Sequence, residues 1–248
     1  MRVLRVDAGD SRFICDEVVE DVLFSIYVNN QSLIQVMIYD QYLEELVIGH
    51  LFTNNIIQSL DEIYELTIDD TSARVELITD LDIALSQDQK NTILEKASTG
   101  RDIPFTRKNN GISELEQDTV NSIMDELNQR GKIFSSTGGT HSALIYNEKM
   151  GTVFAEDVGR FNTIDKVVGI SHMKNFDLGE SILTTSGRLS GEMVIKAAFA
   201  GIPVMCSISA PMRTGVRVAE ASDMTLIGFA RNRRFNVYSG FNRLKASV

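Results

Sequence analysis

Residues 135–160, SSTGGTHSALIYNEKMGTVFAEDVGR, decide how the rest of the chain is interpreted. Two polar turns that contain glycine, Thr137–His141 and Glu156–Arg160, enclose apolar runs at residues 142–146 and 152–156. Short apolar runs bounded by turn residues are typical of buried strands. The stretch therefore predicts two neighbouring strands, and its two polar turns form one wall of a predicted pocket.

Beyond this stretch, strand and helix patterns alternate almost to the end of the chain. Further strands are predicted near residues 181–185, 203–207 and 225–230, and helices near 162–173, 190–200 and 214–222. Such alternation predicts a mostly parallel sheet with helices packed on its faces. The first two strands and a final run at 235–238 are expected to pair antiparallel at the edges of this sheet.

A smaller α+β unit is predicted before the sheet. Apolar runs at 22–28 and 31–39 flank Asn29–Asn30, and asparagine tolerates the positive φ of a tight hairpin turn. Residues 41–57 then change to helical spacing, with Asn54–Asn55 as the predicted end of the helix. Two more strands are predicted at 62–68 and 73–79.

Residues 98–113 contain glycine, proline and Asn-Asn-Gly without periodicity, which predicts an exposed loop. Ser113 and Glu116 match a capping box for a helix that buries Val120, Ile123 and Leu127. Gly131 suits the end of that helix. The predicted organisation is an α+β domain at 1–100, a linker at 101–113 and a larger domain at 114–248.

The composition is that of an ordinary soluble protein, because 43% of the 248 residues are apolar and no run approaches the roughly 18 apolar residues of a membrane span. Because the amino terminus shows no leader pattern either, we expect a cytoplasmic protein without a membrane partner. The net charge of −10 argues against a nucleic acid as partner. Residues 1–131 hold 10 Lys and Arg against 25 Asp and Glu, whereas residues 132–248 hold 14 against 9. The second half is therefore the expected place for an anionic ligand.

Small and polar residues follow the predicted strands, where ligands bind in sheets of this kind. Glycine lets a backbone approach a ligand, hydroxyl groups and helix N-termini suit phosphate oxygens, and arginine supplies charge. A phosphate-bearing ligand is therefore predicted, although each loop also fits a role as a turn, a helix cap or a solvated surface. The loops are Glu156–Arg160, Thr184–Ser190, Ser207–Pro211 and Ala230–Phe235.

The two cysteines, Cys15 and Cys206, form neither a disulfide framework nor a metal-binding spacing. Cys206 lies in an apolar run and is expected to be a buried small hydrophobe, whereas Cys15 is expected to be exposed. With three histidines and no Cys-x-x-Cys or His-x-x-x-His, we expect no metal site. His50 and His172 are interpreted as a helix residue and a helix end.

Several motifs, in this order, closely resemble the formate dehydrogenase accessory protein family, FdhD. The resemblance spans most of the chain. Its motifs are EELVIGHLFTNNII at 44–57, TGGTHSALIY at 137–146, EDVGRFNTIDKVVG at 156–169, TTSGRLSGEMVIKAAFAGIPV at 184–204, SISAP at 207–211 and TLIGFARNRRFNVYSG at 225–240.

The resemblance implies a sulfurtransferase-like accessory protein, or chaperone, with a role in molybdenum cofactor biosynthesis. It would take persulfide sulfur from a cysteine desulfurase and deliver it to the molybdenum bis-guanine-dinucleotide cofactor of the formate dehydrogenase catalytic subunit. A guanine nucleotide would mimic this cofactor. The implied fold is α/β (α+β overall), a cytidine-deaminase-like mixed sheet with flanking helices plus a smaller N-terminal domain, assembled as a homodimer.

Carried over to this sequence, the resemblance also implies which residues contact the cofactor. Asp157 or Asp165 would accept hydrogen bonds from guanine N–H groups, while Lys166, Arg188 and Arg231 would face phosphates. The full set is Gly138, Gly139, Thr140, His141, Asp157, Asn162, Asp165, Lys166, Ser186, Arg188, Ser190, Ser207 and Arg231.

Three positions depart from the family pattern. The family's sulfur-carrying loop usually contains a Cys-x-x-Cys, and residues 98–113 contain no cysteine, although a persulfide relay needs a thiolate. Phe161 stands where histidine is common, and Ile208 stands where many members have arginine. No catalytic residue is therefore assigned, and Cys206 and Cys15 remain the candidate thiols.

Three functions stay open at this point. The first is the family role as sulfur donor, with Cys15 or Cys206 in place of the missing pair. The second is a chaperone that binds the cofactor or a guanine nucleotide without sulfur-transfer chemistry of its own. The third is a zinc deaminase-like hydrolase, which the lack of metal ligands disfavours. The client enzyme is formate dehydrogenase or another molybdenum or tungsten enzyme.

Overall fold

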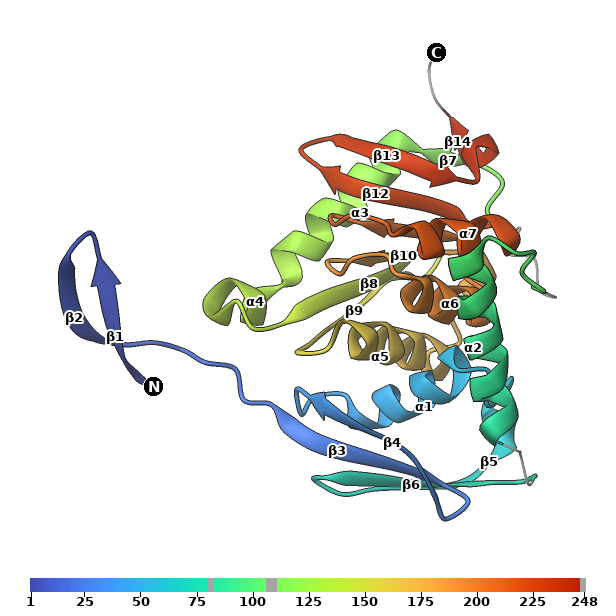
Figure 1. The fold of residues 1–248 in the computed structure, drawn as a ribbon, viewed down its shortest axis with the longest axis horizontal. Coiled ribbons are helices and arrows are strands. Elements are labelled where there is room, and N and C mark those ends of the chain that lie inside the picture. Colours follow the sequence, from blue (N-terminus) through green and yellow to red (C-terminus); the bar gives the residue numbers. More distant parts are fainter. Residues whose placement is uncertain (80–82, 106–110, 246–248) are drawn as a thin grey trace.

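The computed structural model describes residues 1–79, 83–105 and 111–245, and a six-stranded mixed sheet dominates its C-terminal part (Figure 1). The strand order is β13-β12-β11-β10-β8-β9; β10, β11 and β12 run parallel, and the other pairings are antiparallel. The antiparallel edges are as predicted, but only two of the five pairings are parallel, so the sheet is mixed and not mostly parallel. The strands are β8 (His141–Asn147), β9 (Gly151–Asp157), β10 (Ser181–Thr185), β11 (Val204–Ser207), β12 (Thr225–Arg231) and β13 (Arg234–Ser239).

Helices cover both faces of this sheet, because successive apolar side chains along each strand point to opposite sides. Leu144, Ile182 and Ile227 pack beneath α3 (Gln117–Arg130), whose buried residues recur at helical spacing. Ile145 and Leu183 belong instead to the core on the opposite face. That face is covered by α5 (Arg160–Met173), α6 (Gly191–Phe199) and α7 (Arg213–Ala221).

A second sheet of four strands, in the order β4-β3-β6-β5, forms the N-terminal part. Asn29 and Asn30 join its first two strands with φ values of 47° and 62°, which confirms the predicted tight turn. The predicted helix is α1 (Leu43–Thr53), and Asn54 caps its C-terminus. The strands are β3 (Val22–Val28), β4 (Gln31–Ile38), β5 (Ile63–Ile68) and β6 (Ser72–Leu77), with a 3₁₀ turn at Leu60–Glu62.

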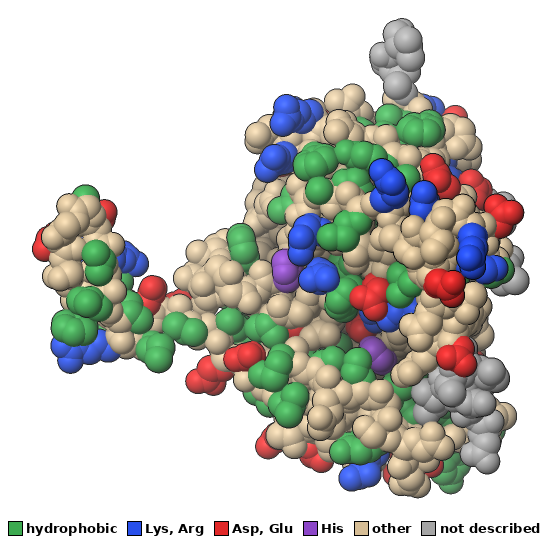
Figure 2. All heavy atoms as spheres, viewed as in Figure 1, with side chains coloured by type: hydrophobic (Ala, Val, Ile, Leu, Met, Phe, Trp, Pro, Cys, Tyr) green, Lys and Arg blue, Asp and Glu red, His purple; other side chains and the backbone are tan. Residues whose placement is uncertain are grey.

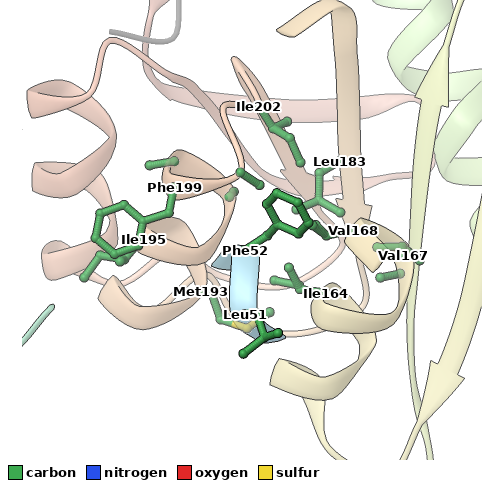
Figure 3. Close-up of a cluster of buried hydrophobic side chains, with 14 of the residues drawn as sticks. Leu51, Phe52, Ile164, Val167, Val168, Leu183, Met193, Ile195, Phe199 and Ile202 are labelled. Carbon is green, nitrogen blue, oxygen red and sulfur yellow. The ribbon is translucent and has the colours of Figure 1, made fainter. Parts of the chain in front are cut away.

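Helices α1 and α5 lie between the two sheets and join them into one continuous core (Figure 1). Phe52 of α1 lies among Val168 of α5, Leu183 of β10 and Ile202 (Figure 3). The backbones of the two helices come very close, because a Cβ added at Gly49 would overlap the carbonyl oxygen of Asp165, and one added at Gly169 would overlap that of Glu45. The boundaries predicted for the two domains stay a prediction.

Several elements were not predicted from the sequence. A hairpin of β1 (Arg2–Asp7) and β2 (Asp10–Cys15) extends away from the body (Figure 1). Helix α2 (Ile83–Thr99) packs against α6 and α7, and α4 (Lys132–Thr137) precedes β8. The hairpin and α4 are short and contain many polar residues, so their hydrophobic periodicity is weak.

The predicted capping box at Ser113 and Glu116 is wrong. The backbone at Leu115–Glu116 forms β7, which pairs in parallel with β14 (Leu244–Lys245). The helix therefore begins only at Gln117, without a side-chain cap, whereas its end at Gly131 is as predicted. In the predicted linker, Phe105 packs against Phe199, and the part of the loop at residues 106–110 lies outside the described residues.

The α1–α5 crossing predicts that Gly49→Ala lowers the free energy of unfolding by at least about 3 kcal/mol, because a backbone oxygen cannot move aside as a side chain can. Chemical denaturation measures the effect. Gly151→Ala is the control, because its φ of 83° is strained but no atom lies within 4 Å of the added Cβ. We expect about 1 kcal/mol there. Equal losses at the two positions would contradict the close crossing.

Candidate functional site

Three loops meet at the end of the six-stranded sheet where β10 and β11 finish and β8 begins. Ser186 Oγ accepts a hydrogen bond from the Ser142 amide at 2.9 Å and lies 3.2 Å from His141 Nδ1. Ser209 Oγ donates to the Ser186 carbonyl, and Ser207 Oγ donates to the Gly187 carbonyl. These bonds fix the loops against each other. We call His141, Arg160, residues 186–190 and residues 207–211 the loop cluster.

The loop cluster carries positive charge. Burial, together with the nearby charges of Arg160 and Arg188, lowers the pKa of His141 below its usual value. Figure 2 shows Lys and Arg side chains gathered beside a histidine on this face of the molecule. An anion bound here would offset these charges, so the electrostatics suit phosphate oxygens.

Two helices begin at the loop cluster. Arg160 is the first residue of α5 and packs against Gly187, while Ser190 is the N-cap residue of α6. Arg160 Nε and Ser190 Oγ are buried and have no hydrogen-bond partner within the described part of the chain. Both polar atoms lie at helix N-termini, where backbone N–H groups also favour anions.

The glycine turn before β8 holds the start of that strand. Gly138 ends α4 with φ 68°, and the Gly139 amide donates to Thr137 Oγ1. Thr140 Oγ1 donates to Glu156, whose carboxylate also accepts from two backbone amides at the start of α4. Gly138 and Gly139 are exposed, whereas Thr140 is buried. The buried hydroxyl group of Thr140 therefore joins α4, β8 and β9.

Asp157 is fully buried and joins α5 to the N-terminal sheet. Its carboxylate accepts from the Tyr39 and Gly159 amides and from Asn162, and forms an ion pair with Lys166 at 2.6 Å. Lys166 also donates to the Tyr39 carbonyl oxygen. Three residues of the predicted cofactor set thus bind partners within the chain: Asp157, Asn162 and Lys166.

A second buried carboxylate, Asp165, joins three helices. Its carboxylate accepts a hydrogen bond from Thr53 of α1 and two from Lys196 Nζ of α6, the latter at 2.7 and 2.9 Å. The carboxylate also lies 2.9 Å from His50 Nδ1. Burial alone would raise the pKa of Asp165, but Lys196 and His50 hold it at about 2. We call Asp165, Lys196, His50 and Thr53 the buried network.

The predicted cofactor residues therefore divide into separate groups. His141, Ser186, Arg188, Ser190 and Ser207 come together in the loop cluster, and Arg231 lies at the exposed end of β12. Their contact with a cofactor stays a prediction. Sequence reasoning placed Arg160 in a predicted ligand-binding loop but did not name it as a contact, and it missed His50, Thr53 and Lys196. Lys196 was the most recoverable, because it is the one charged residue in the apolar stretch MVIKAAFAGI.

The two side chains that depart from the family pattern, Phe161 and Ile208, both pack against neighbouring residues. The Arg160 guanidinium lies over the Phe161 ring, 4.5 Å from its centroid. Ile208 is half-buried against the core beneath α3. Both side chains therefore have packing partners of their own.

Neither thiol lies in the loop cluster. Cys206 is fully buried on the α3 face of the sheet, and burial raises the pKa of its thiol above the usual range, which disfavours the thiolate. Cys15 is exposed on the β1–β2 hairpin, opposite Arg2. Burial of Cys206 and exposure of Cys15 are both as predicted.

The structure describes residues 1–79, 83–105 and 111–245. Among them, no group of three or more His, Cys, Asp and Glu side chains is arranged to hold a metal ion. No helix within the described ranges is long and apolar enough to cross a membrane.

The buried network predicts a strong coupling between Asp165 and Lys196. Lys196→Met should lower the free energy of unfolding by about 3–5 kcal/mol, because it leaves a buried carboxylate without its cation. Adding Asp165→Asn should recover part of this loss, which a double-mutant cycle measures. Glu126→Gln breaks the exposed pair with Arg130 and should cost less than about 1 kcal/mol. Equal losses for Lys196→Met and Glu126→Gln would contradict a structural role for the network.

The chain is similar to known proteins over nearly its full length. The model of the FdhD/NarQ family matches residues 19–245. The sulfur carrier protein FdhD of Bacillus pumilus is 30% identical over 95% of this chain and 94% of its own length. That of Staphylococcus aureus strain Newman is 31% identical over 98% and 94%, respectively.

A solved structure from Desulfotalea psychrophila, described as a formate dehydrogenase accessory protein, has the same fold. Its TM-score is 0.82 at 24% identity, and the match covers 98% of this chain and 97% of that one. The family model and the two relatives confirm the resemblance of the sequence motifs. The chain belongs to the FdhD/NarQ family.

Proposed function

We propose that this protein is an accessory factor for formate dehydrogenase that binds the molybdenum bis-guanine-dinucleotide cofactor and promotes its sulfuration during maturation. The loop cluster is the proposed contact for the phosphates of the cofactor. Its partners are the formate dehydrogenase catalytic subunit and a cysteine desulfurase, and a homodimer is the proposed assembly.

The observation that carries this proposal is the charge and polarity of the loop cluster. The charges of Arg160 and Arg188 both lower the pKa of His141, and two helices begin beside these residues. Guanidinium groups match phosphate oxygens in charge and geometry. The relatives are named as sulfur carriers, which supports the connection with cofactor sulfuration.

Where the sulfur is held is a separate question. The role of sulfur donor requires an accessible thiolate beside the cofactor. Cys206 is sealed in the core, and Cys15 lies on a hairpin that extends away from the body (Figure 1). These positions favour the second candidate, a cofactor-binding chaperone that holds no sulfur on its own cysteines. We propose that the loop cluster presents the cofactor while a partner supplies the sulfur.

Binding at the loop cluster predicts that guanosine diphosphate and inorganic pyrophosphate bind, with affinities that fall as salt concentration rises. Arg188→Ala should weaken both affinities about tenfold or more, because a hydrogen bond to a charged group is lost. Titration calorimetry measures them. Arg130→Ala is the control, since this arginine is exposed on α3 and pairs with Glu126. Wild-type protein that binds neither ligand would refute the proposal.

A chaperone without its own sulfur chemistry predicts that Cys15→Ser and Cys206→Ala both support formate dehydrogenase maturation as well as the wild type does. The assay combines cofactor-loaded protein, a desulfurase with cysteine, and the apoenzyme, and it reads formate oxidation. Mass spectrometry detects any persulfide on the protein. A persulfide on Cys15 together with lost maturation in Cys15→Ser would establish the sulfur-donor role instead.

A further inference from the structure

One buried carboxylate oxygen holds the chain on both sides of Arg160. Asp157 Oδ1 accepts a hydrogen bond from the Gly159 amide and another from Asn162 Nδ2, both at 2.8 Å. Gly159 directly precedes Arg160, and Asn162 lies two residues after it in the first turn of α5. A Cβ added at Gly159 would lie 2.6 Å from Asn162 Nδ2, so the Asn162 side chain packs directly over this turn. The first turn of α5 is therefore anchored on a single oxygen atom.

The second oxygen joins the same carboxylate to the N-terminal sheet. Asp157 Oδ2 accepts from the Tyr39 amide at 3.1 Å and forms the ion pair with Lys166 Nζ. Lys166 Nζ donates in turn to the Tyr39 carbonyl oxygen, and Asn162 Nδ2 donates to the Met37 carbonyl oxygen. Three hydrogen bonds thus join the end of β4 to Asp157 and to α5.

Asp157 and Lys166 hold the start of α5 from inside the protein. Both side chains are 0% exposed, so neither can contact a bound ligand while this pair is intact. Their opposite charges also offset each other. An unpaired carboxylate beside the start of α5 would oppose the positive charge of the loop cluster, and Lys166 prevents this.

Arg160 is the residue of the loop cluster that this arrangement places. Its side chain packs against Gly187, because a Cβ added there would lie 3.1 Å from Arg160 Cβ. Its charge also acts on His141, since burial, Arg160 and Arg188 together lower the pKa of that ring. The pKa of His141 therefore reports on where the Arg160 charge lies.

We propose that Asp157 is a positioning residue for anion binding, because its Oδ1 holds the first turn of α5, and with it Arg160, against the loop cluster. Through Oδ2 and Lys166, this position also depends on the end of β4. The inference rests on the proposed function, since it explains how an arginine of the phosphate site is placed. For Asp157 and Lys166, this role takes the place of the direct cofactor contact that the family resemblance implies.

Two double variants isolate the Oδ1 contact at equal charge. Asp157→Ala with Lys166→Met removes the acceptor together with its counter-ion, so no buried charge is left unpaired. Asp157→Asn with Lys166→Met has the same charge but restores a side-chain oxygen toward the start of α5. The alanine variant should raise the pKa of His141 toward its ordinary value of about 6.5, because Arg160 is no longer held nearby, and the asparagine variant should raise it less. Histidine NMR of the ligand-free protein measures this pKa, and His141→Gln assigns the signal.

Pyrophosphate affinity gives a second readout. Calorimetry should show about tenfold weaker binding for the alanine double variant and a loss of about threefold or less for the asparagine one. The control Leu127→Ala should destabilise the protein on the opposite face of the sheet, yet should change neither the affinity nor the pKa of His141. A residue with only a structural role would behave like this control.

A single variant keeps the test valid if the double variants do not fold. Asn162→Ala removes one of the two bonds to Oδ1 without changing the charge, and it should also raise the pKa of His141 in the ligand-free protein. An unchanged pKa of His141 in Asn162→Ala would contradict the positioning role.

The outcomes separate this inference from the proposed function. Equal His141 pKa values in the wild type and the alanine double variant would overturn the positioning role, whether or not pyrophosphate binds. Equal pKa changes in the alanine and asparagine variants would also overturn it, because the Oδ1 acceptor would then have no effect. Wild-type protein that binds no pyrophosphate would instead refute the phosphate site, while the pKa titration would still show whether Asp157 places Arg160.

Discussion

The buried carboxylate of Asp165 is the contact on which the structure most depends. It lies on α5 and binds Thr53 of α1 and Lys196 of α6, with His50 as a further partner. A charged group buried without a counter-ion and hydrogen bonds would be strongly unfavourable. The three helices are therefore held in one relative arrangement, and both sheets pack on that arrangement.

The close crossing of α1 and α5 has a functional consequence. Because glycines let the two backbones approach, His50 reaches the carboxylate of Asp165 from the neighbouring helix. The same crossing leaves a cavity beside the start of α5, where Arg160 belongs to the loop cluster. The helices that stabilise the core thus also line this cavity, which is apolar along β4 and carries charged side chains from α2, α5 and α6.

The positions of the thiols separate binding from sulfur chemistry. The sheet requires an apolar side chain at Cys206, and the same burial that makes it a good core residue disfavours its thiolate. Cys15 is accessible but lies on a two-stranded hairpin away from the body. The chain belongs to the FdhD/NarQ family, and neither of its two cysteines lies in the loop cluster.

Hydrophobic periodicity and turn residues determined most of the secondary structure, because they are local properties of the chain. The strands of both sheets, the Asn29–Asn30 turn and helices α1, α5, α6 and α7 follow from them. The failed capping-box prediction has a non-local cause. Strand pairing at Leu115–Glu116 overrode a capping-box pattern, because a partner 129 residues away extended the backbone.

The candidate site was only partly readable from the sequence. The glycine turn before the first strand and the polar loops after later strands were predicted to line one pocket, and His141, Ser186 and Arg188 do lie near one another. The partners of Asp165 were not readable, since His50 lies 115 residues away and Lys196 lies 31 residues away. Sequence by itself determined which residues carry charge and which segments are buried. Only the tertiary structure decided which charges neutralise each other inside the core and which stay free for a ligand, because that depends on contacts between distant segments.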